Sequence, residues 1–320
     1  MKIVELKEVL MEVPVDVLKY ISSKYELESG NGNKEDMVDS IVHSASQKEK
    51  LDQLILVAKE YRYAGRHAVD WFQYAEPKAV SLKEFEEKLI EEYSTEIFVF
   101  GRMRPALEKN PKAIFAEIDR DRNQMLMMFA YNGPVRRILV NYEPRHDHPT
   151  YFDYAMVKFD PLTIEVRASF SMSKRIMASI VTLLGLNEKL FQRIEVIGDK
   201  GIEELRRVLE ANVQLARHQS LVGDYDWIEV MSDPEIGNLL ESKHYQDEIS
   251  KGPSKRKIYT FKHTYSFGHE EYVTLEVNTE LGRFWFRSAV GEEVIQRVLQ
   301  AVKKVTEANG DEQIRGPRES

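Results

Sequence analysis

Apolar side chains recur at helical spacing through the first quarter of the chain. Ile3, Leu6 and Leu10 are three or four residues apart, and the same spacing continues over residues 51–63. This spacing places apolar side chains on one face of an α-helix, which can then pack against neighbouring helices. The pattern therefore predicts an all-helical N-terminal domain over residues 1–78.

Polar residues mark the expected starts of these helices. Asn33 precedes an apolar-periodic run, and asparagine is a favoured N-cap because its side chain accepts a hydrogen bond from the first turn. Ser46 with Glu49, and Ser81 with Glu84, have the three-residue spacing of a capping box. These residues predict three helix starts, the second of which opens the segment 51–63.

Short β-prone runs replace the helical pattern from about residue 95. Asn132-Gly133 stands between two of these runs and is a strong signal for a two-residue hairpin. Ser171 then caps a helix that ends at Gly185. Together they predict a mixed β-sheet domain with a backing helix over residues 79–192. Its expected strands are 96–100, 113–118, 125–131, 135–142, 151–159 and 162–170.

The strand expected at residues 125–131 has a distinctive composition. Its odd-numbered and its even-numbered positions are both apolar. Because successive side chains of a strand point to opposite faces, this strand is expected to be central and covered on both sides. On the following strand, Arg136 and Arg137 must face opposite sides, so only one of them can join a continuous basic surface.

The remaining residues predict a smaller C-terminal α+β domain over residues 193–308, followed by a disordered polar tail over residues 309–320. The whole chain is therefore expected to belong to the α+β class. The elements expected in the last domain are strands at 194–197, 258–265, 272–278 and 283–289 and helices at 202–215 and 292–305.

Composition narrows the class of protein. The 320 residues include 42% hydrophobic and 31% charged residues, as in ordinary soluble proteins, and no cysteine. A disulfide scaffold, a cysteine-ligated metal and a cysteine nucleophile are thereby excluded. No apolar run reaches the roughly 18 residues of a membrane span, and Glu5, Glu8 and Glu12 do not suit a signal peptide. We expect an intracellular protein without membrane attachment, located in the cytoplasm, nucleoid or nucleus.

Charge is unevenly distributed along the chain. The formal net charge is −8, yet residues 100–180 hold 13 Lys or Arg against 9 Asp or Glu. An acidic chain with a basic middle can still bind a polyanion, although random variation of a mixed surface explains the same numbers. The residues expected to contact nucleic acid are Lys34, Arg62, Arg66, Arg102, Arg104, Arg136, Arg137, Lys174 and Arg175.

Several of these residues have a local reason to bind phosphate. Lys34 follows a glycine-bearing link at the start of a helix, where free backbone N–H groups attract anions. The two helices and the link resemble the helix–extension–helix of SAP-type DNA-binding modules, although a plain helical hairpin has the same pattern. Tyr61 to His67 interleaves aromatic residues with Arg62 and Arg66, which suits either stacking on bases or packing under a neighbouring helix.

A wider stretch, residues 5–185, resembles the centromere protein N family. The resemblance rests on Val13-Pro14, on the helix that begins at Lys34-Glu35, and on the segments 68–73 and 148–152. It implies a pyrin-like helical domain before a β-sheet domain, nucleosome binding through basic residues of both, and a C-terminal region that pairs with a partner of related fold. The N-terminal domain is acidic here, which departs from the basic surface of that family.

Two clusters suit metal chemistry. His146 and His148 with nearby acids offer nitrogen and oxygen ligands, but prolines on both sides favour a polar turn. Glu117, Asp119 and Asp121 offer carboxylates for magnesium, but a charged hairpin end explains them as well. Motifs of phosphate loops, dinucleotide-binding folds, serine hydrolases and zinc proteases are absent from the sequence. We therefore expect no metal and no cofactor.

Arg283, Trp285 and Arg287 alternate with Phe284 and Phe286 on the last predicted strand. The phenylalanines are expected to face the closing helix, which leaves Trp285 and its flanking arginines toward solvent or a partner. Packing of this face by residues 200–250 is the alternative.

The sequence favours a non-catalytic DNA- or chromatin-binding adaptor. Its expected DNA surface is a groove between the helical and central domains, and its C-terminal domain is expected to bind a second copy or a partner of related fold. The expected DNA is double-stranded or part of a nucleosome-like complex. A metal-dependent nuclease or hydrolase and a purely protein-binding scaffold remain the alternatives.

Overall fold

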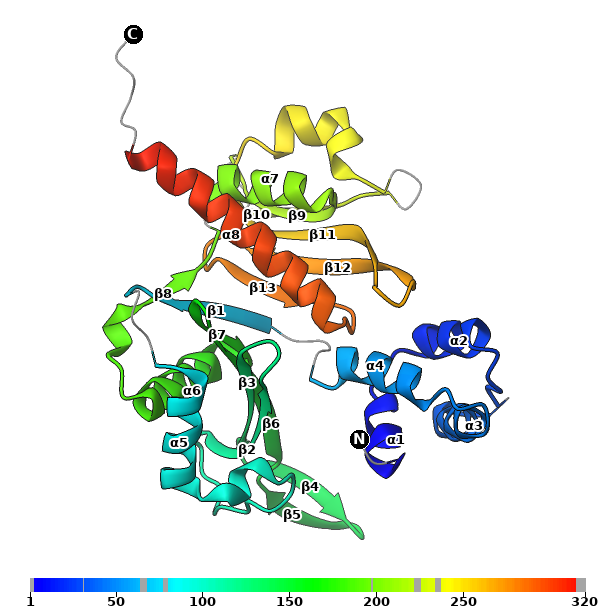
Figure 1. Cartoon of the computed structure of the whole chain (residues 1–320). Coiled ribbons are helices and arrows are strands. Elements are labelled where there is room, and N and C mark those ends of the chain that lie inside the picture. Colours follow the sequence, from blue (N-terminus) through cyan, green and yellow to red (C-terminus); the bar gives the residue numbers. More distant parts are fainter. Residues whose placement is uncertain are drawn as a thin grey trace. The chain divides into compact units, whose positions relative to one another are not determined.

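The computed structural model describes residues 3–30, 32–63, 68–76, 80–196, 198–221, 226–233 and 237–314. Helices pack on antiparallel strands (Figure 1), so the predicted α+β class is confirmed. The chain forms two compact units: unit 1 comprises residues 1–67 and 195–320, and unit 2 comprises residues 68–194. The predicted division into domains 1–78, 79–192 and 193–308 stays a prediction.

The N-terminal part of unit 1 is a small bundle of helices. Its core is formed by their apolar faces, for example Leu10, Leu18 and Ile41, which are fully buried. Asn33 accepts a bond from Asp36 N while Asp36 bonds Asn33 N, so the predicted cap is confirmed as a complete capping box. The helices are α1 (Ile3–Leu10), α2 (Val15–Lys24), α3 (Lys34–Gln47) and α4 (Leu51–Tyr61).

The C-terminal part of unit 1 is an antiparallel sheet with two helices on one face. Its strands are β9 (Asn212–Gln219), β10 (Trp227–Met231), β11 (Ser254–Thr264), β12 (Glu270–Asn278) and β13 (Arg283–Phe286), paired in the order β10-β9-β11-β12-β13. Helices α7 (Gly198–Leu209) and α8 (Glu292–Ile314) contact each other and cover the face that carries Phe261 and Phe286. Between β10 and β11 lie the short helices η3 (Leu239–Glu241) and η4 (Tyr245–Ile249).

An aromatic cluster joins the helical bundle to the β11–β12 hairpin within unit 1. The ring centroids of Tyr61 in α4 and Tyr265 lie 5.9 Å apart, and those of Tyr20 in α2 and His269 lie 5.0 Å apart. Tyr265 also donates to Glu271 at 2.6 Å and packs edge-to-face on His263. The bundle is therefore held to the hairpin by large, mostly buried side chains.

Unit 2 is an antiparallel sheet with α5 (Leu82–Tyr93) and α6 (Phe170–Leu184) on one face. The strands pair in the order β1-β7-β6-β3-β2, and β8 adds to the other edge of β1. The remaining elements are β1 (Ala68–Tyr74), η1 (Thr95–Phe98), β2 (Lys112–Asp119), β3 (Gln124–Asn132), β4 (Arg136–Val140), β5 (Glu143–Asp147), β6 (Thr150–Phe159), β7 (Leu162–Arg167), η2 (Glu188–Leu190) and β8 (Phe191–Ile194).

Strand β3 lies between β2 and β6 and is buried on both faces from Met125 to Ala130. The predicted central position of this strand is confirmed. The capping box of Ser81 and Glu84 at the start of α5 is confirmed as well. The helix predicted to end at Gly185 does so, with that glycine in the left-handed conformation.

Two segments have the wrong predicted type of secondary structure. Residues 68–74 fall in the predicted helical domain but form β1, because Val69 and Trp71 alternate with partly exposed or polar positions and pair with β7. The strand predicted over residues 96–100 is instead the 3₁₀ helix η1, in which the Ser94 side chain accepts a bond from Glu96 N.

The hairpin predicted at Asn132-Gly133 is wrong. Strand β3 pairs with β2 and β6, whereas β4 pairs with β5 through the two-residue turn Asn141-Tyr142. Both turn residues have positive φ, 51° and 67°, as a type I′ turn requires. Gly133 N is bonded to Pro149 O, which ties this segment to the start of β6 rather than to β4.

Other differences concern element boundaries. Ser46 lies inside α3 and caps nothing, since Lys50 precedes α4. The cap residue of α6 is Ser169, two residues before the predicted Ser171. The helix predicted over residues 202–215 stops at Leu209, and β9 follows. Helix α8 extends to Ile314, into the tail predicted as disordered, and residues 315–320 lie outside the described part of the chain.

Across the residues that the structure describes, no helix has both the length and the apolar character needed to cross a bilayer.

Candidate nucleic-acid interface

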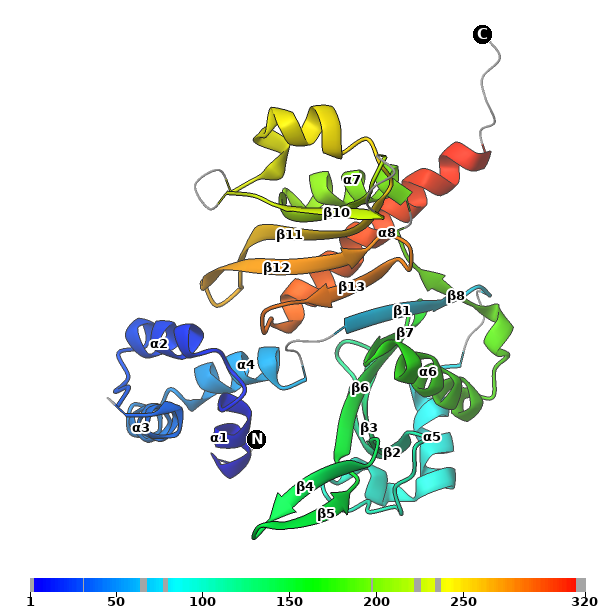
Figure 2. The same cartoon turned by 180° about the vertical axis from the view of Figure 1, so that it is seen from behind.

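Strands β4 and β5 form a separate two-stranded ribbon that extends beyond the ends of β3 and β6 (Figure 1, Figure 2). Each strand is five residues long, which gives the ribbon a length of roughly 17 Å. All its described side chains are exposed, and Leu139 and Tyr142 near the turn are 72% and 99% exposed. The ribbon therefore offers its side chains to a partner on both faces.

The two faces of the ribbon differ in charge. Directly opposed residues of an antiparallel pair share a face. Arg137 is opposite His146 and Leu139 is opposite Pro144, so one face carries no carboxylate. On the other face, Arg136 is opposite Asp147 and Ile138 is opposite Arg145, and Glu143 lies on this face as well. The prediction that Arg136 and Arg137 face opposite sides is thereby confirmed.

Contacts with the sheet hold the root of the ribbon. The Arg136 guanidinium bonds the hydroxyl of Tyr151, whose ring stacks on Tyr131 at 5.8 Å between centroids. His148 Nδ1 lies 3.1 Å from Gly133 O. A Cβ on Gly133 would lie 2.2 Å from the Tyr151 ring, so only glycine permits this close approach. The ribbon therefore leaves the sheet at a defined position.

A buried acid supports the same root. Tyr131 donates from its hydroxyl to Asp153 Oδ2 at 2.8 Å. Burial raises the pKa of the Asp153 carboxyl, and the hydrogen bond from Tyr131 partly opposes this shift. Burial and the nearby Asp153 carboxylate both raise the pKa of Tyr131 above its ordinary value. This pair is therefore part of the support of the ribbon.

The loop over residues 99–111 and the first turns of α6 lie at the same end of unit 2. Asn132 N bonds Glu108 O, and Arg175 Nη1 lies 3.3 Å from Lys109 O and 3.4 Å from Asn110 Oδ1. Strand β7 runs back along β6 from its far end, so that α6 starts toward the end of the sheet at which β6 begins. The antiparallel topology therefore gathers segments that are far apart in the sequence.

We call this region, residues 99–112, 134–149 and 170–176, the cationic end. It contains nine Lys or Arg and three Asp or Glu. Eight of the nine cations are exposed, and the ninth, Lys112, is partly buried and paired with Glu108. The cations are Arg102, Arg104, Lys109, Lys112, Arg136, Arg137, Arg145, Lys174 and Arg175.

Six predicted nucleic-acid-binding residues belong to the cationic end: Arg102, Arg104, Arg136, Arg137, Lys174 and Arg175. Sequence reasoning missed three further cations, Lys109, Lys112 and Arg145. No local signal identifies them, because their convergence depends on the pairing of β2, β3 and β6.

The other predicted residues belong to unit 1 or lie outside the described residues. Lys34 Nζ donates to Met11 O at the end of α1, and the first turn of α3 is capped by the chain's own side chains. The Arg62 guanidinium lies 4.9 Å from the centroid of the Tyr63 ring. Arg66 lies outside the described residues.

The predicted protein interface lies on the sheet of unit 1. Phe284 and Phe286 are buried against the helices, as predicted, whereas Trp285 is 41% exposed on the opposite face. Arg287 lies 4.4 Å from the Trp285 ring centroid and pairs with Glu276. The alternative that residues 200–250 cover this face is wrong for α7, which packs with α8 on the other face. The interface itself stays a prediction.

The residues predicted for metal chemistry are engaged in local contacts. Asp119 accepts bonds from Arg122 N and Gln124 Nε2 at the β2–β3 turn. His146 lies on the ribbon face without carboxylates, whereas His148 follows β5 and its Nδ1 lies 3.1 Å from Gly133 O. Within the described ranges, no three His, Asp or Glu side chains are grouped so that they could hold a metal ion.

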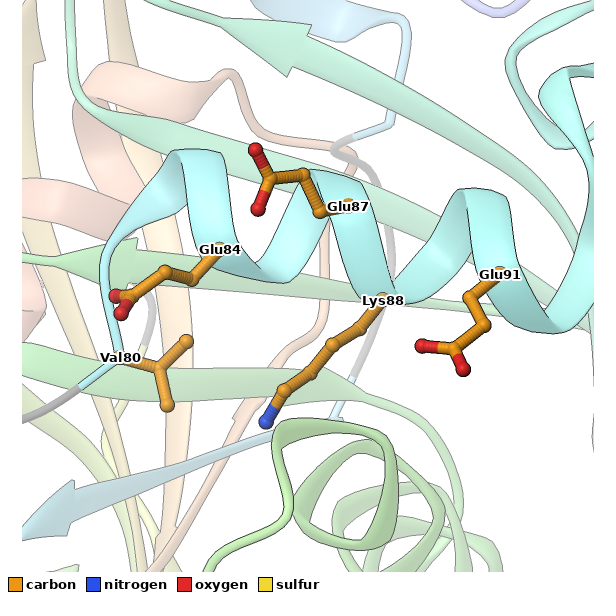
Figure 3. A pocket seen from close by; sticks show the side chains of 5 residues that line it. All are labelled: Val80, Glu84, Glu87, Lys88 and Glu91. Carbon is orange, nitrogen blue, oxygen red and sulfur yellow. The ribbon is translucent and has the colours of Figure 1, made fainter.

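A shallow pocket of about 260 Å³ lies along α5 (Figure 3). Three glutamates and Val80 line it together with Lys88, whose ammonium donates to Leu184 O at the end of α6. One of the glutamates, Glu84, belongs to the capping box of Ser81. The pocket is therefore acidic, and two of its charged residues are engaged at helix ends.

Charged residues also lie inside unit 2. Glu165 and Arg167 are almost fully buried on the face of the sheet opposite α5 and α6, and Arg167 Nε donates to Glu165 Oε1 at 2.8 Å. Trp71 Nε1 donates to Glu165 Oε2 at 3.0 Å. Burial alone would raise the pKa of Glu165, but the charges of Arg167 and Lys158 hold it well below its usual range. This carboxylate is ionised and belongs to an ion pair.

No protein-family model matches the chain. The comparison with curated proteins returns no match either.

Proposed function

We propose that this chain is a non-catalytic protein that binds double-stranded DNA through the cationic end of unit 2. The observation that carries the proposal is the convergence of nine cations with only three acids at one end of the sheet. Phosphate contacts by Lys and Arg supply most of the affinity of proteins for DNA of any sequence. The β4–β5 ribbon adds a two-stranded element of the kind that some proteins place in a groove of DNA.

The chromatin and adaptor parts of the proposal have separate support. The likeness to centromere protein N suggests that the DNA belongs to a nucleosome-like complex. The exposed Trp285 and its arginines support a protein-binding surface on unit 1, for a second copy or a partner of related fold. We further propose an intracellular location, where DNA is accessible. The groove between the helical and central domains stays a prediction.

Salt-dependent binding tests the proposal. We expect the chain to bind a short duplex with little sequence preference. With about four to six phosphate contacts, its affinity should fall roughly a hundredfold or more between about 50 mM and about 200 mM salt. Fluorescence anisotropy of a labelled duplex measures this slope. The absence of binding to any DNA at the lower salt concentration would remove the proposal.

A charge-reversal pair tests the location of the surface. The variant Arg102→Glu, Arg104→Glu, Arg175→Glu should lose DNA binding while its melting temperature stays nearly unchanged, because all three side chains are exposed. The matched control reverses exposed cations outside the cationic end: Lys83→Glu, Arg122→Glu, Lys189→Glu. An equal loss of DNA binding in both variants would show that the net charge of the protein, and not the cationic end, determines the binding.

A further inference from the structure

The apolar residues near the tip of the ribbon have no role in the core of unit 2. Leu139 and Tyr142 are exposed, and Val135 and Ile138 are half exposed at 52% and 39%. Exposed apolar side chains on a projecting two-stranded ribbon promote aggregation, and proteins usually keep such positions polar. The tip therefore points to a contact that buries it in a partner.

The charge of the ribbon selects the face that can approach DNA. We call the face with Arg137, Leu139, Pro144 and His146 the acid-free face. The opposite face presents Glu143 and Asp147, which repel phosphate, and its Arg136 is bonded to Tyr151. Only the acid-free face can lie against a polyanion without a carboxylate beside it.

We infer that the acid-free face of the ribbon lies in the minor groove and that Leu139 inserts between two base pairs, which kinks the duplex. This inference rests on the proposed DNA binding and specifies its substrate as DNA that bends easily or is already distorted. Apolar side chains such as leucine act as wedges in the minor groove, and basic residues beside them hold the backbone. Arg137 and the cations of the cationic end that lie outside the ribbon provide the basic residues.

The geometry of the turn suits a wedge. Asn141 and Tyr142 close β4 and β5 with both residues at positive φ, which defines the tip without a flexible loop. Leu139 is the last residue of the acid-free face on β4 whose side chain is described, and its partner across the ribbon is Pro144. A ribbon of about 17 Å spans about five base pairs, so the tip can reach a base step while the root contacts phosphates.

Insertion has a measurable consequence. Unstacking a base step has a free-energy cost, and a mismatched step has already lost part of its stacking. The wild-type chain should therefore bind a duplex with a central mismatch about tenfold more tightly than the intact duplex. It should also bring the two ends of an end-labelled duplex closer together, as measured by resonance energy transfer between the labels.

A matched pair of variants isolates the wedge. Leu139→Ser should lose the preference for the mismatch and the bending, and should keep the intact-duplex affinity within about threefold, because the phosphate contacts remain. Ile138→Ser changes a neighbouring apolar residue on the opposite face and should keep both properties. Circular dichroism melts show whether each variant is folded.

A second pair tests the face. Arg137→Ala should lower the affinity and reduce the salt slope by about one unit, and its effect should be larger than that of Arg136→Ala, because the Arg136 guanidinium is bonded to Tyr151. Equal effects of the two substitutions would overturn the assignment of the face.

The outcomes separate this inference from the proposed function. If wild type and Leu139→Ser bind with the same bending and the same preference, the wedge is wrong, the tip is a surface for a protein partner, and DNA binding stands. If neither duplex is bound by the wild-type chain, the proposed function itself fails.

Discussion

Glu165 and Arg167 show how a single ion pair can be indispensable without being a source of stability. Both side chains are almost fully buried, and the carboxylate accepts bonds from Arg167 and Trp71 and lies 3.6 Å from Lys158 Nζ. Removing two charges from water costs more than their attraction commonly returns. The pair is needed because removal of either charge would leave the other one buried without its partner, which is strongly destabilising.

At the residue scale we therefore predict the effect of breaking this pair. Arg167→Met should lower the free energy of unfolding by about 3–5 kcal/mol, because Glu165 then keeps a buried charge without the ion pair that Arg167 provides. The double variant Glu165→Gln, Arg167→Met should be less destabilised than Arg167→Met alone. Urea unfolding followed by circular dichroism measures both. A double variant with the summed loss of the two single variants would contradict the explanation.

At the element scale, the helix caps can be predicted from neighbouring residues of the sequence, whereas the position of the hairpin turn cannot. The capping boxes of Asn33 and Ser81 are made by residues three positions apart, so the sequence contains the whole interaction. The turn at Asn141-Tyr142 places a tyrosine at positive φ, where sequence rules expect glycine or asparagine. Asn132-Gly133 has the stronger sequence signal for a hairpin turn. In the structure, however, Asn132 N is bonded to Glu108 O and Gly133 N is bonded to Pro149 O, and no hairpin forms there.

The candidate site also has a part that can be predicted from the sequence and a part that depends on the fold. The excess of cations over residues 100–180 is visible in the sequence, and six of its residues were identified there. Lys109 and Arg145 could not be identified, because β2, β3 and β6 must pair before these residues meet at one end of the sheet. Which ribbon face lacks carboxylates depends on the register of β4 with β5, and this register is fixed by the turn that the sequence does not reveal.

Two histidines of the β11–β12 hairpin, His263 and His269, are expected to make the stability of the protein depend on pH. Burial lowers the pKa of His263, and Arg297 adds to this while Glu293 opposes it. Burial also lowers the pKa of His269, against the charge of Asp16. A lowered folded-state pKa means that the unfolded chain binds more protons, so stability falls as pH drops through the ordinary histidine range.

The melting temperature should therefore decrease between about pH 7.5 and about pH 5.5. The variant His263→Gln, His269→Gln should show a smaller decrease, and part of the slope should remain because burial lowers the pKa of His218 as well. Burial raises the pKa of Glu271, which acts in the opposite direction but closer to the ordinary range of carboxyl groups. Thermal melts at several pH values measure the slope, and an equal slope in the variant would contradict the role of these two histidines.

At the scale of the whole molecule, the exposed face of the unit 1 sheet bears on assembly. Trp285 is an aromatic anchor beside Arg287, a combination enriched in the centres of protein interfaces. We predict that the intact protein forms a dimer or binds a partner of related fold through this face. Trp285→Ala should weaken that association by about 2–4 kcal/mol with little change in melting temperature.

Light scattering of the wild type and of Trp285→Ala, alone and mixed with a candidate partner, measures the association. Arg207→Ala is a suitable control, because Arg207 is exposed on α7, which packs with α8 on the other face of the sheet. A monomer in both proteins, together with a large loss of thermal stability in Trp285→Ala, would instead make Trp285 a residue needed for folding.

The separation of charge within unit 2 affects how this unit approaches a partner. Residues 68–194 contain eighteen Lys or Arg and eighteen Asp or Glu, so the unit is formally neutral. The cationic end lies at the start of α6, whereas Lys88 and the glutamates of α5 lie toward its other end. A neutral body with separated charges has a large electric dipole. In the DNA binding that we propose, the field of a duplex would exert a torque on this unit rather than a net attraction, and would turn the ribbon toward the DNA before contact. Ions screen that torque beyond about 10 Å at 0.1 M salt, so ionic strength sets how early the unit turns.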